Sequence, residues 1–144
     1  MFKKIYIGSD HGGFSLKELI IAQLKNASVV VVDKGAFTTA SCDYPVFAQA
    51  VSQAVLADPG SCGILICGTG IGMSMAANRI KGIRAAVCTD AYTTRMTRAH
   101  NDANVLCLGE RVTGPGVAAE IVDLFLVTEF EGDRHLKRIN LFEE

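Results

Sequence analysis

The chain has 144 residues, a length typical of one domain, and a chain of this size buries roughly 68–70% of its unfolded surface without disulfides or metals. Hydrophobic residues make up 49% of the sequence and charged residues 20%, which excludes a disordered tail, a collagen-like fibre and a low-complexity linker. Fourteen basic and fifteen acidic residues give a net charge of -1. We therefore expect no broad cationic surface, and neither nucleic acid nor an anionic membrane as a partner.

The sequence contains five cysteines, an odd number with no C-x-x-C pair and few histidines nearby, which disfavours a zinc finger. Reduced cysteines in apolar runs behave as small hydrophobic residues, and we expect this role for Cys62, Cys88 and Cys107. A reducing, cytoplasmic location fits this cysteine usage best. The N-terminal segment lacks the apolar core of a signal peptide, and no apolar stretch approaches the ~20 residues of a membrane span.

Short apolar segments alternate along the chain with longer segments of helical periodicity. The predicted strands are Ile5–Gly8, Val29–Asp33, Gly63–Cys67, Arg84–Cys88 and Asn104–Leu108. The predicted helices are Leu16–Lys25, Tyr44–Ala57, Gly72–Arg79, Tyr92–Ala99 and Gly116–Thr128. Their apolar faces include Leu16, Leu19, Ile20 and Leu24 in the first helix and Ala118, Ile121, Val122 and Phe125 in the last.

This alternation predicts an α/β fold: a Rossmann-like three-layer sandwich with a five-stranded parallel sheet and right-handed crossovers. Residues 1–144 form a single domain in this interpretation, because glycine and proline fall at turns rather than in a linker. The charged residues 129–144 are expected to form a C-terminal helical arm.

Polar segments flank the predicted strands, and ligands of open parallel sheets bind at the carboxyl ends of strands. Gly8-Ser9-Asp10-His11-Gly12-Gly13 follows the first strand, and Cys67-Gly68-Thr69-Gly70-Ile71-Gly72 follows the third. His100-Asn101-Asp102 lies just before the fifth strand. We expect these three segments to gather at one site.

Three alternating glycines in the segment 67–72 allow a tight turn that brings several backbone N–H groups toward one point. Such a loop, opening the next helix, binds a phosphate or an oxyanion formed during a reaction; a plain strand–helix turn is the alternative. The spacing fits neither a nucleotide P-loop, which needs a lysine, nor a dinucleotide fingerprint. A cysteine-dependent phosphatase needs an arginine six residues after the cysteine, where this chain has Met73.

Cys67 ends the third strand against this loop, where the field of the amides favours a thiolate that acts as nucleophile or as base. Asp10 and His11 suit acid–base chemistry or ligand binding, unless Asp10 only caps the next helix. Arg134 and Arg138 are four residues apart, so on a helix they share one face and suit a dianionic phosphate. A solvated, charged helix end is the alternative interpretation of that pair.

Several longer motifs occur in order along nearly the whole chain. They are Gly8-Ser9-Asp10-His11-Gly12-Gly13-Phe14, Asp43-Tyr44-Pro45, Ile66-Cys67-Gly68-Thr69-Gly70-Ile71-Gly72, Ala77-Asn78, Gly82-Ile83-Arg84-Ala85, His100-Asn101-Asp102-Ala103-Asn104-Val105-Leu106 and Glu131-Gly132-Asp133-Arg134-His135. Their combination is specific, although no single motif is. With these motifs the sequence resembles the sugar-phosphate isomerase family that contains type B ribose-5-phosphate isomerases and galactose-6-phosphate isomerases.

The resemblance implies an enzyme that interconverts an aldose phosphate and a ketose phosphate without a metal or an organic cofactor. Ribose 5-phosphate and ribulose 5-phosphate are the expected pair. By this resemblance, Cys67 is the base that moves a proton between C2 and C1 through an enediolate, and Thr69 assists at the hydroxyl that is relocated. The enediolate oxygen is held by the amides of the loop, namely those of Gly68, Gly70, Ile71 and Gly72.

The resemblance also implies roles for residues outside this loop. His100, helped by Asp10, opens the furanose ring. The phosphate is bound by His11, Asn101, Arg111, Arg134 and Arg138. The family is dimeric with active sites shared between chains, so His100, Asn101 and Arg111 are expected to reach the partner's site; whether dimers pair into tetramers stays open.

One position departs from the family pattern. Related sequences usually read Glu-Gly-Gly-Arg-His, and this chain has Asp133 in place of the second glycine. A carboxylate beside Arg134 is expected to weaken phosphate binding or to change the path of the arm. Three alternative functions stay open at this point: an isomerase of galactose 6-phosphate or allose 6-phosphate, a non-catalytic sugar-phosphate or nucleotide sensor, and a hydrolase that uses Cys67 and His100.

Overall fold

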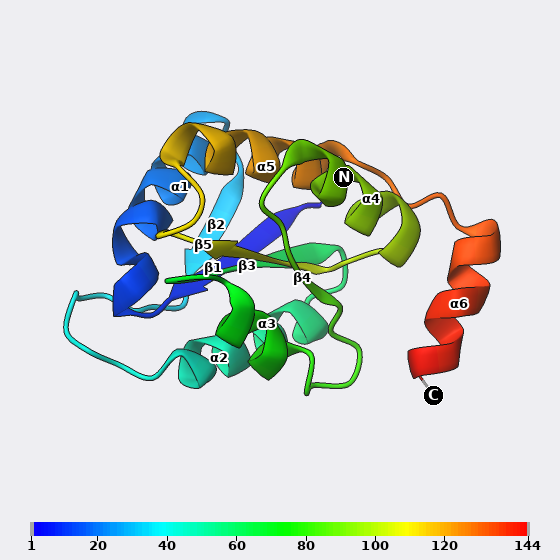
Figure 1. The fold of residues 1–144 in the computed structure, drawn as a ribbon, viewed down its shortest axis with the longest axis horizontal. Helices are drawn as coiled ribbons and strands as arrows, with labels where there is room; N and C mark the ends of the chain where they lie inside the picture. The colour runs from blue at the N-terminus through cyan, green and yellow to red at the C-terminus, as the bar shows by residue number, and fades with distance from the viewer. Residues whose placement is uncertain (1, 144) are drawn as a thin grey trace.

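Five apolar segments form one parallel sheet at the centre of the molecule (Figure 1). The computed structural model describes residues 2–143, and its strands are β1 (Lys4–Ser9), β2 (Val30–Asp33), β3 (Ser61–Cys67), β4 (Ala85–Val87) and β5 (Val105–Gly109). The strand order is β2-β1-β3-β5-β4, and every neighbouring pair is parallel. The predicted five-stranded parallel sheet is confirmed.

Helices cover both faces of this sheet. They are η1 (His11–Gly13), α1 (Phe14–Asn26), α2 (Tyr44–Ala57), α3 (Ile71–Ala77), α4 (Ala91–Asn101), α5 (Pro115–Val127) and α6 (Asp133–Glu143). In Figure 1, α1, α4 and α5 lie over one face, and α2 and α3 lie over the other, which confirms the three layers. The expected C-terminal helical arm is α6, which contacts α4 and stands apart from the sheet (Figure 1). Within residues 2–143, no helix is long and apolar enough to cross a membrane.

Burial on both faces explains why the strands are continuously apolar. All seven residues of β3 are buried, and a strand covered by helices on both sides has no solvent-facing positions. On α5, the four predicted core residues are fully buried. On α1 the prediction for Leu19 is wrong, because its side chain is 54% exposed. The buried stripe of α1 instead runs through Leu16, Ile20 and Leu24 and continues to the Lys17 and Ile21 side, away from Leu19.

Three cysteines belong to this core, as the sequence predicted. Cys62, Cys88 and Cys107 are buried, with at most 1% of each residue exposed. Burial raises the pKa of the Cys62 thiol to about 12 and that of Cys88 to about 11, because the thiolate is poorly solvated there. The pKa of Cys107 is raised well above its ordinary value for the same reason. These thiols therefore stay protonated and inert.

A buried lysine anchors the loop between β2 and α2. The Lys17 side chain is fully buried, and its Nζ donates hydrogen bonds to Asp33 Oδ2 and to the Ala36 carbonyl oxygen, both at 2.6 Å. The rings of Phe14 and Phe37 also face the ammonium, each with its centroid 5.3 Å from Nζ. A buried ammonium requires such partners, since an unpaired charge in the interior is costly.

Replacing Lys17 with methionine removes this anchor and leaves Asp33 without its counter-ion. We expect the Lys17→Met variant to lose about 3 kcal/mol of unfolding free energy, measured by urea denaturation. Lys25→Met is the matched control, because Lys25 is an exposed lysine near the end of the same helix. Equal denaturation midpoints for the two variants would contradict the anchoring role.

Candidate active site

Two polar loops meet at the carboxyl ends of β1 and β3, the neighbouring strands between which the chain order reverses. Such a reversal is where open α/β sheets bind their ligands. The loop after β1 begins with Asp10, and the loop after β3 begins at Gly68. A Cβ added to Gly12 would lie 3.4 Å from the Gly68 amide nitrogen, and one added to Gly13 would lie 2.5 Å from the Ile66 carbonyl oxygen. The two loops are therefore in contact, and the approach of the first loop to β3 requires glycine at position 13.

The Cys67 sulfur faces the amides of its own loop. Cys67 is the last residue of β3 and is 6% exposed, and its Sγ accepts a hydrogen bond from the Gly70 N–H at 3.1 Å. Gly70 has φ of +79°, and a Cβ there would lie 3.0 Å from the Leu108 carbonyl carbon, so the turn requires glycine. The next N–H, of Ile71, donates to Thr69 Oγ1 at 3.3 Å. The loop thus places the thiol, the hydroxyl and several N–H groups together.

The first loop contributes a carboxylate and an imidazole to the same edge. Asp10 caps η1, with Oδ1 accepting a hydrogen bond from the Gly12 N–H at 2.8 Å, so the capping interpretation of this residue holds. The Asp10 N–H also donates a hydrogen bond to the Ile66 carbonyl oxygen at 3.2 Å, which holds Asp10 beside the end of β3. His11 is exposed, and its Nδ1 accepts a hydrogen bond from the Cys42 N–H at 3.2 Å. A neutral His11 therefore carries its proton on Nε2 and can donate it to an anion.

A guanidinium lies over the loop after β3. A Cβ added to Gly68 would lie 3.3 Å from Arg111 Nη1, and one added to Gly12 would lie 3.5 Å from Nη2. Backbone hydrogen bonds hold this arginine in place, with the Arg111 N–H donating to the Gly68 carbonyl oxygen at 3.0 Å. The carboxyl edge of one chain thus combines Asp10, His11, Cys67 and Arg111, a set that suits an anionic ligand and proton transfer. Arg111 lies beside the Cys67 loop of its own chain, whereas the resemblance placed it in the partner's site.

The segment His100-Asn101-Asp102 lies at the amino edge of the sheet, opposite the carboxyl edge that holds Cys67. His100 and Asn101 end α4, and β5 then starts at Val105, which pairs with Gly63. Cys67 pairs with Gly109, four residues further along β5, which corresponds to about 13 Å at 3.3 Å per residue. One chain therefore does not bring the three polar segments to one edge of the sheet, because a segment that precedes a parallel strand lies at the strand's amino end.

The arm belongs to this amino edge as well. In Figure 1, α6 (red) and the loop that follows β2 (cyan) lie at opposite ends of the molecule. Arg134 and Arg138 are exposed on α6, as the sequence predicted for a helical arm. One chain therefore does not bring the two arginines near Cys67.

Residues at the amino edge form a cluster that the sequence analysis missed. The His100 ring stacks on the ring of His135 with centroids 4.1 Å apart and planes 8° apart. The Glu131 carboxylate faces both rings, 3.8 Å from His100 Nε2 and 3.6 Å from His135 Nε2. Burial lowers the pKa of His135, and positive charge on His100 and Arg134 lowers it further, whereas Glu131 acts in the opposite sense. In the sequence, this cluster is indicated only by the four-residue spacing of Glu131 and His135, which brings two side chains together on a helix.

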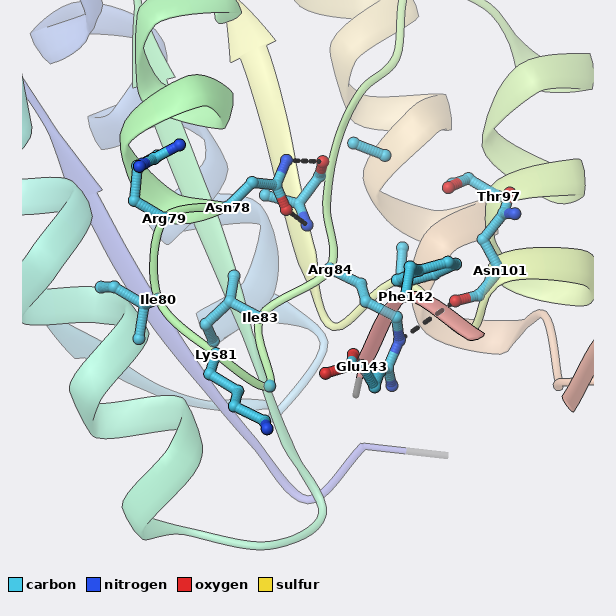
Figure 2. Close-up of a pocket in the computed structure, with 14 residues that line it drawn as sticks. Asn78, Arg79, Ile80, Lys81, Ile83, Arg84, Thr97, Asn101, Phe142 and Glu143 are labelled. Atoms are coloured by element: carbon cyan, nitrogen blue, oxygen red, sulfur yellow. Dashed lines mark hydrogen bonds and ion pairs between the residues drawn. The ribbon is translucent and has the colours of Figure 1, made fainter. Parts of the chain in front are cut away.

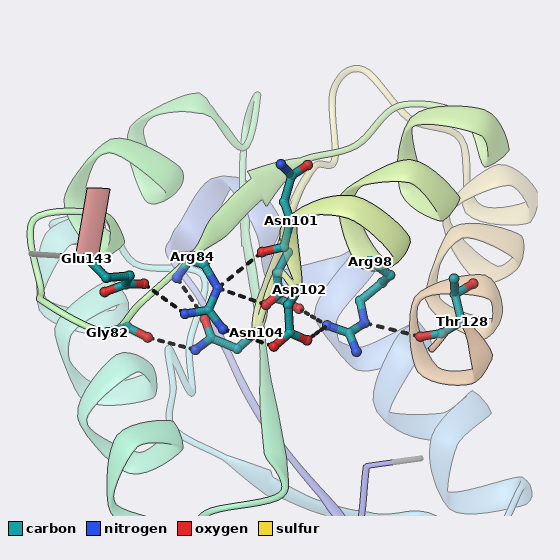
Figure 3. Close-up of polar contacts among 9 residues, drawn as sticks. Gly82, Arg84, Arg98, Asn101, Asp102, Asn104, Thr128 and Glu143 are labelled. Atoms are coloured by element: carbon teal, nitrogen blue, oxygen red, sulfur yellow. Dashed lines mark hydrogen bonds and ion pairs between the residues drawn. The ribbon is translucent and has the colours of Figure 1, made fainter. Parts of the chain in front are cut away.

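Ion pairs fix the end of α4 against the arm (Figure 3). The Asp102 carboxylate binds Arg98 Nη1 at 2.8 Å and Arg84 Nη2 at 3.2 Å. Arg84 also donates from Nε to the carbonyl oxygens of Asn101 and Asp102, and its Nη1 binds Glu143 Oε1 at 2.8 Å. Asp102 is therefore a structural residue that joins two elements and sets the position of Asn101.

A pocket of about 620 Å³ lies beside this network (Figure 2). Its lining comes from the segment between α3 and β4, from the end of α4 and from the last residues of α6, including Arg79, Arg84, Asn101 and Phe142. Cys67 does not line it. The Cys67 loop and this pocket therefore belong to different edges of the molecule.

The burial of the cysteines predicts how they react in the native protein. We expect iodoacetamide at mildly alkaline pH to modify half-buried Cys42 and loop-facing Cys67 at least about tenfold faster than Cys62 and Cys88, whose raised pKa values keep them as thiols. Mass spectrometry of proteolytic peptides measures each rate. Modification of Cys62 before Cys67 would contradict this placement of the sulfur, and denatured protein, in which all five react, is the control.

Comparisons with known proteins place this arrangement in a family. Residues 5–142 match the family model described as Ribose/Galactose Isomerase. Ribose-5-phosphate isomerase B of Escherichia coli is 48% identical over 137 residues, which cover 95% of this chain and 92% of that protein. The structure of Clostridium thermocellum ribose-5-phosphate isomerase B superposes with a TM-score of 0.96 at 51% identity, covering 97% and 95% of the two chains. That of the Mycoplasma genitalium enzyme with bound ribulose-5-phosphate gives 0.93 at 44% identity, covering 97% and 93%. The chain belongs to the ribose/galactose isomerase family.

Proposed function

We propose that this protein is an isomerase that interconverts ribose 5-phosphate and ribulose 5-phosphate by proton transfer through an enediolate, without a cofactor. The observation that carries the proposal is the Cys67 sulfur, which accepts the Gly70 N–H beside a turn of converging amides at the switch point of the sheet. The names of the relatives support the choice of substrate, since one related structure is described with bound ribulose-5-phosphate. The cytoplasm is the proposed location, because all five cysteines are free.

Proton abstraction next to a carbonyl creates negative charge on oxygen, so the base and the anion-stabilising groups must be adjacent. In this proposal, the Cys67 thiolate takes the proton from C2 of the open-chain aldose and returns it to C1. The carbonyl then moves from C1 to C2, and the Thr69 hydroxyl assists the proton exchange between the two oxygens. Amides of Gly68 to Gly72 stabilise the enediolate oxygen. The loop meets this requirement because thiol, hydroxyl and N–H groups lie within three residues of one another.

Ring opening and phosphate binding are assigned to both edges of the sheet. His11 and Arg111 lie at the carboxyl edge beside Cys67. The ring-opening residue His100 lies at the amino edge, with Asn101 and the arginines 134 and 138 of α6. A phosphate held by cations from both sets anchors the reacting carbons near the base. Asp10 assists His100 only if the two edges come together from different chains.

We infer that a homodimer supplies this contact, with each active site built from both chains. About 13 Å of sheet separates the two halves of the site within one chain, and a second copy related by twofold symmetry places the two edges face to face. The arm has the surface for such a contact, since Leu136, Leu141 and Phe142 are 49%, 71% and 62% exposed. Burial of these side chains against a partner removes an apolar surface from water.

Three other functions make different predictions. An isomerase of galactose 6-phosphate or allose 6-phosphate uses the same loop, and the family description includes galactose. A sugar-phosphate sensor binds without turnover, and it has no use for a thiol beside the amides. A hydrolase that uses Cys67 and His100 forms a covalent acyl intermediate, which mass spectrometry of the intact protein would detect. A coupled assay across pentose and hexose phosphates, with a chelator present, separates these functions.

Cys67→Ala is expected to lower the kcat for ribose 5-phosphate by at least about 100-fold while substrate binding and thermal stability stay close to those of the parent, because only the base is removed. The coupled assay and calorimetry measure these two properties. Cys42→Ala is the control, since the Cys42 side chain is not assigned a role and the substitution keeps the backbone N–H that donates to His11. Turnover within tenfold of the parent would place the base elsewhere, and a higher kcat/KM for hexose phosphates would overturn the ribose assignment.

Mixing two inactive variants tests the shared site. Cys67→Ala and His100→Asn each disable both sites of a homodimer, but a hybrid dimer keeps one site in which both residues are intact. After unfolding and refolding of equal amounts together, we expect about a quarter of the parental activity, because half of the dimers are hybrids. Cys67→Ala mixed with Thr69→Ala is the control, since those residues lie on the same loop and no intact site forms. Hybrids without activity would mean that each site belongs to one chain.

A further inference from the structure

Two imidazoles and a carboxylate converge where three segments of the chain meet. His100 comes from the end of α4, His135 from α6 and Glu131 from the connection that leads into α6. One ligand atom from each of these residues lies within 4.8 Å of the other two. The Glu131 N–H donates a hydrogen bond to the Ala99 carbonyl oxygen at 3.0 Å, which fixes this connection beside the end of α4. The cluster therefore rests on backbone that is held at a defined place.

His135 contributes an atom that the rest of the chain leaves unpaired. The residue is only 6% exposed, and its Nε2 is buried without a hydrogen-bond partner among residues 2–143. Glu131 Oε2 lies 3.6 Å from His135 Nε2, which is too long for a hydrogen bond. A buried ring nitrogen without a partner is costly, so such an atom in a folded protein is completed by a water, an ion or another ligand.

We propose that His100, Glu131 and His135 form a binding site for a divalent transition-metal ion such as zinc. Two imidazole nitrogens and one carboxylate oxygen are three ligands of the types that bind zinc, and they leave a fourth position for water or an anion. Magnesium and calcium prefer oxygen ligands alone and do not suit this set. The proposed function does not require this ion, and none of the roles assigned to these residues in it depends on metal.

Binding requires one local movement. The stacked rings are nearly parallel, so their nitrogens face the same carboxylate oxygen without pointing at a common centre. The His100 side chain is 35% exposed and is free to turn toward the ion, whereas His135, 7% exposed, stays packed. Positive charge on Arg134 and Arg138 acts on His135 and opposes the binding of a cation. The site is therefore expected to bind zinc more weakly than a structural site without such neighbours.

An ion at this site inhibits the enzyme, a consequence that rests on the proposed function. The metal takes the lone pair of His100, and the ring then has no free nitrogen with which to move the proton of the furanose hydroxyl. It also turns the ring away from the position that the stack on His135 holds. Zinc inhibition of this kind acts on the ring-opening step, and the ion takes no ligand from Cys67.

The test follows the ring signals of the three histidines by NMR while zinc is added to the full-length protein after chelator treatment. We expect the ring signals of His100 and His135 to shift together at equimolar zinc, and those of His11, which the proposed dimer places across the shared site, to shift less than either. Glu131→Gln removes the carboxylate charge and keeps the side-chain shape, so it is expected to weaken zinc binding at least about tenfold. Glu129→Gln, at an exposed acid two residues earlier, is the matched control and should bind as the parent does. Magnesium is the control cation.

Several outcomes overturn the metal site: zinc that shifts no histidine, zinc that shifts only His11, zinc held by cysteines with unchanged rings, or equal affinity in the Glu131→Gln and Glu129→Gln variants. Circular dichroism verifies that both variants are folded. In the coupled assay, zinc should inhibit the parent over the concentration range in which the rings shift, and Glu131→Gln should need at least about tenfold more zinc. Binding at both rings without inhibition would support the site and overturn the ring-opening role of His100, so the two proposals fail separately.

Discussion

All strands of the sheet run in one direction, and this single constraint decides which polar groups one chain can bring together. Loops that leave the strands collect at the carboxyl edge, so the segments after β1 and β3 meet beside Cys67. Segments that enter the strands collect at the opposite edge, so the end of α4 carries His100 and Asn101 away from the thiol. In the function proposed above, a sugar phosphate that needs groups from both edges requires a second chain, and α6 exposes apolar side chains on which we propose that this chain packs.

The chemistry at the carboxyl edge depends on packing beneath it. β3 is buried along its whole length, which leaves its last residue, Cys67, little freedom to move. The loop that follows is pressed against β5: a Cβ at Gly109 would lie 2.6 Å from the Thr69 carbonyl carbon, and Gly70 needs a left-handed backbone beside Leu108. Amides held in this way stabilise negative charge without reorganising during the reaction, which is the property that an enediolate intermediate requires.

Local patterns in the sequence predicted what local forces determine. Continuous apolar runs gave the five strands to within two residues at each end, and alternating glycines located the turn at Cys67. Long-range contacts were not visible in this way. Nothing in the sequence indicates that Lys17 is buried, because its partners Asp33 and Ala36 lie 16 and 19 residues further along the chain. His135 likewise gains its role only from the stack on His100. The edge on which His100 lies follows from strand direction, because His100 precedes β5 along the chain. In the sequence analysis it was grouped with segments that follow strands, although the order of the elements was already known.

The arm departs from the sheet and still has a fixed position, because both of its ends are held. The arm begins at Asp133, and both Gly132 and Asp133 have left-handed φ values, of +69° and +46°. Aspartate tolerates this conformation better than most residues, so replacing the usual glycine does not prevent the turn, and a carboxylate in the first turn favours the helix. No ion pair joins Asp133 to Arg134 among residues 2–143, which leaves that guanidinium available to a phosphate. At the other end, Glu143 is paired with Arg84. An arm fixed in this way can present cations to a neighbouring chain in the defined geometry that a shared active site requires.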